Sequence, residues 1–148
     1  MVMNAHRHVP ALLLLLSAAC ASSESDPTAL GAELQPGTVF LAQSEPPGAV
    51  MDALFDGTVA RDGSGCLRLE GGDRPTVVWP YGAELTSRAG AFWVRDAAGR
   101  EIGRIGGSFR FGGGEIPSLH DGIPLTAAQR SLAAERCPGR YWIVGEIL

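Results

Sequence analysis

The chain has 148 residues, of which 45% are hydrophobic, and a formal net charge of -4 with no lysine. This acidic balance argues against nucleic acid as a partner, because phosphate binding usually leaves a strongly basic domain. Once an export signal is set aside, the remaining length allows one small domain with a modest core and leaves no room for a second.

An apolar segment from Val9 to Ala19 follows a short polar start that carries Arg7. It ends in the small residues Ser17, Ala18 and Ala19, and Cys20 comes directly after them. These are the parts of a secretory signal. The segment is shorter than the roughly 20 residues that a permanent spanning helix needs to cross about 30 Å of hydrocarbon. Residues 1–19 are therefore predicted to be an export signal.

The string Leu16-Ser17-Ala18-Ala19-Cys20 resembles the lipobox of bacterial lipoproteins. This resemblance covers the first twenty residues. It implies cleavage before Cys20 and attachment of a lipid to that thiol, so that the mature protein is anchored to a membrane of the cell envelope. Ala21 in place of an aspartate implies the outer membrane, if the cell has one. The alternative is cleavage by the general signal peptidase, with Cys20 incidental.

The cysteine count fits lipid attachment. Three cysteines are an awkward number for an exported protein, and assigning Cys20 to the lipid leaves Cys66 and Cys137 as a pair. Because nothing keeps thiols reduced outside the cytoplasm, this pair is predicted to form a disulfide. The alternative is two buried free thiols.

Residues 20–48 are predicted to form a flexible tether. Ser, Glu, Pro, Ala and Gly dominate this stretch, and such a composition buries too little apolar surface to offset chain ordering. Val39-Phe40-Leu41 interrupts it and is expected to dock as an extra edge strand. The folded domain is then predicted over residues 49–148.

From Val50 onward, short apolar or alternating runs are separated by glycine-containing turns, which is the pattern of an antiparallel β protein. The clearest hairpin loop is residues 96–99, in which Gly99 can take a positive φ at no steric cost. The predicted strands cover Leu54–Ala60, Cys66–Leu69, Thr76–Trp79, Ala91–Asp96, Arg100–Ile105, Ser108–Phe111 and Tyr141–Ile147.

One helix is predicted over residues 127–136. Thr126 as N-cap and Gln129 at the third helical position form a capping box, and Pro138 ends the helix. The last strand is apolar on both faces, which is typical of a strand that is central or closes a barrel. We therefore predict a mainly β fold, a small, partly closed antiparallel barrel that is OB-like but has its helix before the last strand. A β-sandwich is the alternative.

Residues 118–121 bring a hydroxyl, an imidazole and a carboxylate together, which suggests a small hydrolase that uses Ser118 and His120. No nucleophile-elbow glycine pattern surrounds Ser118, so a polar loop before the helix is the preferred interpretation. The histidine and the carboxylates offer no metal-ligand spacing, and we predict neither metal nor cofactor. Residues 112–114, Gly-Gly-Gly, lack the Lys and Ser/Thr of a P-loop and are interpreted as strand-corner glycines.

Aromatic and cationic residues alternate on the predicted strands. Trp93 and Arg95 share one face of their strand, and Arg104 and Arg110 are predicted to extend that face on neighbouring strands. A ring among cations suits sugars, peptides or anionic polymers. The alternative is a solvated face on which arginine stems cover apolar surface.

The strings Cys66-Leu67-Arg68-Leu69 and Cys137-Pro138-Gly139 are similar to those of small, uncharacterised β-rich domains of bacterial lipoproteins. This resemblance implies no activity. We expect a lipid-anchored envelope protein, a non-catalytic binding or structural module whose partner is an envelope protein or a glycan. The alternatives are the hydrolase and a module that binds polyanions.

Overall fold

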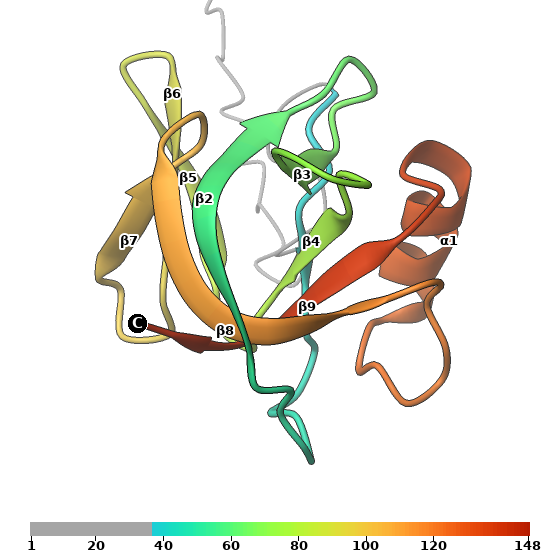
Figure 1. Cartoon of the computed structure of the whole chain (residues 1–148). Helices are drawn as coiled ribbons and strands as arrows, with labels where there is room; N and C mark the ends of the chain where they lie inside the picture. Colours follow the sequence, from blue (N-terminus) through green and yellow to red (C-terminus); the bar gives the residue numbers. More distant parts are fainter. Residues whose placement is uncertain (1–36) are drawn as a thin grey trace, which may run out of the picture.

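The computed structural model describes residues 37–148 (Figure 1). The predicted signal segment, Cys20 and the first part of the predicted tether lie outside these residues. In chain order, the elements are β1 (Leu41–Ala42), β2 (Ala53–Arg61), β3 (Leu67–Leu69), β4 (Thr76–Trp79), β5 (Glu84–Arg88), β6 (Ala91–Arg95), β7 (Glu101–Arg104), β8 (Ser108–Ile116), α1 (Ala127–Arg136) and β9 (Tyr141–Ile147).

Five strands form a closed barrel. The long strand β2 pairs with β3 and with β8, and β9 lies beside β8, all in antiparallel pairs. The parallel pairing of β4 with β9, in which Val77 lies opposite Trp142, closes the ring. Closure leaves no strand edge open in the barrel wall. The prediction of a mainly β, OB-like barrel with the helix before the last strand is confirmed.

A second sheet of three strands, β5-β6-β7, is inserted between β4 and β8. Its strands β5 and β6 are joined by Ala89 and Gly90, both with positive φ, as a tight two-residue hairpin requires. The inward side chains Leu85 and Val94 are buried and join the core of the barrel. Strand β5 was not predicted, because Leu85 is its only apolar residue.

Aromatic rings fill the barrel. Trp79 of β4 is fully buried, and its ring centroid lies 5.8 Å from that of Phe40 and 5.4 Å from that of Phe109. Phe55 and Phe111, paired across β2 and β8, stack at 5.1 Å. Aromatic residues bury large areas and dominate core energetics, so this cluster is the main source of hydrophobic stabilisation.

A second core lies between the outer face of the barrel and α1. Ala133 on the helix packs with Val78 of β4 and Ile143 of β9. The predicted capping box is present, with the Thr126 side chain accepting from the Gln129 backbone amide. The Gln129 side chain also donates to the carbonyl of Ala42 at 3.0 Å, which ties the helix to β1.

The folded domain begins before residue 49. Leu41 of β1 pairs in parallel with Val78, and residues 38–43 include buried side chains on both sides of the strand. Phe40 enters the core of the barrel and Leu41 the core under the helix, so the apolar trio that interrupts the predicted tether is part of both cores. The predicted docking of this trio as an edge strand is confirmed, because β1 is the edge strand of the six-stranded sheet. The polar residues around it concealed only its burial in both cores.

The glycine triplet lies in the strongly curved strand β8 (Figure 1). A Cβ at Gly113 would overlap the carbonyl oxygen of Ile143, and a Cβ at Gly114 would overlap the Met51 side chain. These glycines therefore permit close packing of β9 and of the segment before β2, in agreement with a structural interpretation of the triplet.

We predict that Gly65→Ala destabilises the domain by at least about 2 kcal/mol, because Gly65 has a φ of +87° and a Cβ there would overlap the carbonyl oxygen of Gly37. Gly63→Ala is the matched control in the same turn, since a Cβ at Gly63 meets nothing within 4 Å. Urea unfolding measures both variants. Equal stability of the two would contradict the tight contact between this turn and the start of the domain.

Candidate binding surfaces

The sheet β5-β6-β7 presents a face with an aromatic ring among charges. Trp93 of β6 lies opposite Thr86 of β5 and Arg104 of β7. Because Phe92 and Val94 pack into the core, Trp93 points away from it, and the ring is half-buried. The Arg88 guanidinium lies 4.9 Å from the centroid of the ring, within the range of a cation–π interaction.

Charges on this face are partly paired. The Glu101 carboxylate of β7 forms ion pairs with Arg88 at 3.2 Å and with Arg95 at 3.4 Å. Exposed Arg104, in contrast, makes no ion pair with any described residue. The Trp93 face, defined as Thr86, Arg88, Trp93, Arg95, Glu101 and Arg104, therefore offers a ring and an available guanidinium to a ligand.

The structure brings together only part of the predicted binding face. Trp93, Arg95 and Arg104 lie on the three-stranded sheet, but Arg110 lies on β8 of the barrel, opposite Asp56 of β2. Alternation along a strand indicates which residues share its face, but it does not indicate which strands are neighbours. Arg88 and Glu101 were missed as members of this face, although the Ala89-Gly90 turn before β6 is a signal for the hairpin that carries Arg88.

Ser118 and His120 lie in an exposed loop before α1. The His120 Nδ1 atom accepts a hydrogen bond from the Gly122 backbone amide at 3.1 Å, and Arg130 donates to the His120 carbonyl at 3.0 Å. In the described part of the chain, no hydrogen bond joins Ser118 to His120. The structure therefore shows a locally bonded loop rather than a nucleophile paired with a base.

Two general features of the described residues bear on ligand classes. Residues 37–148 contain no group of three or more His, Cys, Asp or Glu side chains arranged to hold a metal ion. Within the same residues, no helix has the length and hydropathy of a membrane span.

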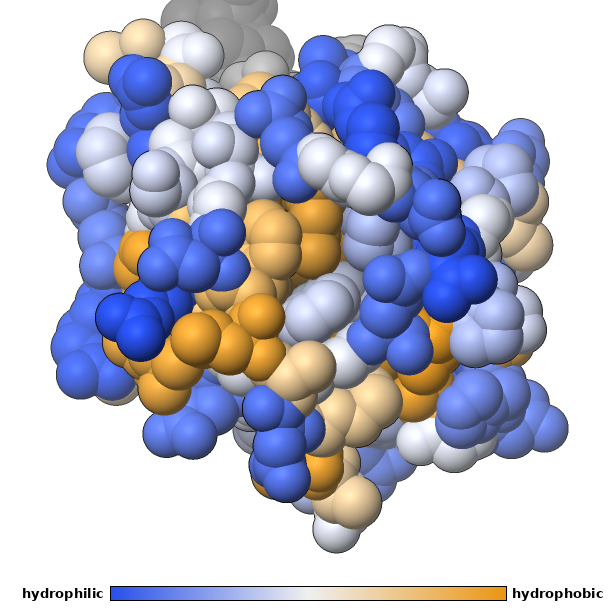
Figure 2. All heavy atoms as spheres, viewed as in Figure 1, coloured by the Kyte–Doolittle hydropathy of each residue, from blue (hydrophilic) through white to orange (hydrophobic). Residues whose placement is uncertain are grey.

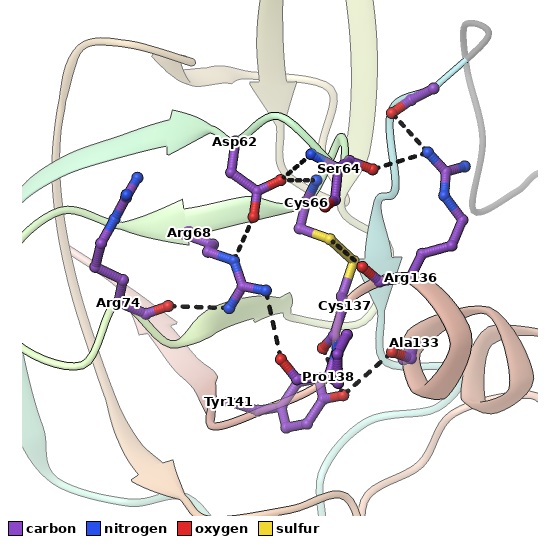
Figure 3. The surroundings of a disulfide bond; sticks show 11 residues. Asp62, Ser64, Cys66, Arg68, Arg74, Ala133, Arg136, Cys137, Pro138 and Tyr141 are labelled. Atoms are coloured by element: carbon purple, nitrogen blue, oxygen red, sulfur yellow. Dashed lines mark hydrogen bonds and ion pairs between the residues drawn. A yellow bond between two sulfur atoms is a disulfide. The ribbon is translucent and has the colours of Figure 1, made fainter.

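The disulfide joins two segments beside the barrel closure (Figure 3). Cys66, just before β3, is bonded to Cys137, the C-cap of α1, with the Cα atoms 5.8 Å apart. Cys66 and Cys137 are fully buried. The link thus connects the early strands of the barrel to the short segment that leads into β9.

Arg68 of β3 holds three segments around the disulfide. Its Nε donates to Asp62 at 2.6 Å, and its two terminal nitrogens donate to the carbonyls of Arg74 at 3.1 Å and Pro138 at 3.4 Å (Figure 3). These partners lie in the turn after β2, in the loop before β4 and in the segment before β9. A single planar guanidinium can make these contacts because its donors have fixed, divergent directions.

The Asp62 carboxylate organises the turn between β2 and β3. It accepts hydrogen bonds from the backbone amides of Ser64 and Cys66, each at 2.9 Å, and a third from the Arg68 side chain. Partial burial opposes ionisation, but these hydrogen bonds outweigh it and lower the pKa of Asp62. The pKa of Asp62 is therefore lower in the folded protein than in the unfolded chain. The stabilisation that its carboxylate provides is present above the unfolded pKa and is lost as the pH falls through the folded pKa.

On comparison with known proteins, no family model, no curated protein and no solved structure matches this chain.

Proposed function

We propose that this chain is a lipid-anchored protein of the bacterial cell envelope that binds an acidic glycan without catalysing a reaction. The anchor is Cys20, in the string that resembles a lipobox. The binding surface is the Trp93 face. The observation that best supports binding is the half-buried Trp93 ring flanked by Arg88, next to an Arg104 guanidinium that pairs with no described residue.

The chemistry of the Trp93 face suits an acidic sugar polymer. An aromatic ring can stack against the apolar face of a sugar ring, and a guanidinium recognises a carboxylate through two parallel hydrogen bonds. Glu101 already occupies Arg88 and Arg95, so Arg104 is the primary contact for ligand charge. Leu85 and Val94 of this sheet pack into the barrel core, which holds its strands in one geometry and reduces the ordering that binding requires.

We predict that the protein binds polygalacturonate and that binding weakens as salt is raised. Trp93→Ala and Arg104→Ala should each weaken it by about tenfold, as expected for a central contact worth about 1.4 kcal/mol. Arg110→Ala is the matched control, because it removes the same charge from the other sheet. Calorimetric titration measures the affinities. Equal losses for Arg104→Ala and Arg110→Ala, or no loss for Trp93→Ala, would exclude this surface.

The anchor has a separate test. Growth of the producing cells with a radioactive fatty acid should label the protein, and Cys20→Ala should lose the label because the acceptor thiol is gone. The matched control is Ser22→Ala, which changes a nearby hydroxyl and should keep the label. Equal labelling of the native protein and Cys20→Ala would rule out lipidation at this residue.

A further inference from the structure

Apolar side chains gather on the outer surface of the barrel where β2 begins and β9 ends. Val50, Leu54 and Leu148 are 58%, 54% and 63% exposed, and Met51 is 38% exposed. Among the described residues, Tyr81 is the one other large hydrophobic residue with such exposure. Figure 2 shows apolar side chains gathered on the face where β2, β8 and β9 meet in Figure 1. Exposed apolar groups gathered in this way mark interaction sites.

These four side chains line one groove, and Gly112 of β8 lines it too. In the sheet register, Gly112 lies between Leu54 of β2 and Glu146 of β9. A Cβ at Gly112 would meet only atoms of Glu146, at 3.9 Å. The missing side chain therefore leaves open space between two outward-facing residues, and an apolar group of a partner can occupy it.

Two carboxylates complete the groove. Asp52 and Glu146 are both exposed lining residues, and neither makes an ion pair with another described residue. Arg110, two residues from Gly112 on the same face of β8, lies opposite Asp56 in the register, and its carbonyl accepts a hydrogen bond from the Leu148 amide. Its side chain is not among those that line the groove. The Gly112 groove thus combines apolar walls with two carboxylates that form no ion pair with a described residue.

We propose that the Gly112 groove binds an extended, cationic segment of a partner protein. An apolar side chain of that segment lies over Gly112, and flanking Lys or Arg residues pair with Asp52 and Glu146. Apolar burial supplies affinity, and the carboxylates select the sign of the partner's charge. This site is separate from the Trp93 face and does not depend on glycan binding.

Charge complementarity favours a cationic partner segment over three other possible occupants of the groove. A two-fold pair of copies of this chain would place the same acidic groove on both sides of the interface. An anionic membrane surface would repel both carboxylates. Residues 20–36 of the chain itself contain three acidic residues and no Lys or Arg, so they carry the same sign as the groove. Only a cationic segment complements both the apolar walls and the carboxylates.

The test uses the mature chain and a short fluorescent peptide that alternates Leu and Lys, with its Leu/Glu twin as the control ligand. Fluorescence anisotropy should show binding of the Leu/Lys peptide only. Gly112→Leu fills the groove and should weaken binding by about tenfold. Gly63→Leu adds the same side chain where a Cβ meets nothing within 4 Å and should leave binding unchanged.

Two further variants distinguish a loss of binding from a folding defect. Leu54→Gln, at an exposed position, should weaken binding with an unchanged melting temperature. The double variant Asp52→Asn/Glu146→Gln should reduce the salt dependence of binding. Equal binding of the Leu/Glu peptide, or full binding by Gly112→Leu, would overturn the proposal. A dimer in sedimentation experiments, or binding to phosphatidylglycerol vesicles, that Gly112→Leu abolishes would reassign the groove to that occupant and overturn it too.

Discussion

The structure depends on the parallel pairing of β4 with β9, which closes the barrel. Both strands lie between the two cores: Trp79 and Val144 face the interior of the barrel, while Val78 and Ile143 face the helix. Without this pairing, each strand would expose a row of backbone groups and one apolar face. Closure therefore combines burial of both cores with backbone hydrogen bonding between strands that are far apart in the chain.

The pairing brings together segments that are far apart in the chain, and the disulfide offsets part of the entropy that this costs. Cys66 and Cys137 are 71 residues apart, and a link of that span restricts the unfolded chain strongly on the chain-entropy model. Arg68 acts at the same place without a covalent bond, because its donors reach the turn after β2 and the segment before β9. The region around the disulfide thus fixes the entry into β9.

Local signals in the sequence predicted the parts of the fold that local chemistry decides. The helix starts and ends where Thr126 and Pro138 indicate, and counting cysteines predicted the pair that is bonded. Features that need distant neighbours were not predictable. Strand β5 has too few apolar residues to show a period, Arg110 was assigned to a face on another sheet, and the Gly112 groove exists only because β2 and β9 flank β8. For the same reason, only the structure shows that Phe40 and Leu41 contribute to two different cores.

The covalent link between Cys66 and Cys137 stabilises closure of the barrel. Urea unfolding of the double variant Cys66→Ser/Cys137→Ser, compared with the oxidised native protein, measures this stabilisation. We predict that the free energy of unfolding falls by about 4 kcal/mol, as the loss of a link across such a loop implies. A fall of less than about 1 kcal/mol, with the native disulfide verified by mass spectrometry, would show that the link does not stabilise closure.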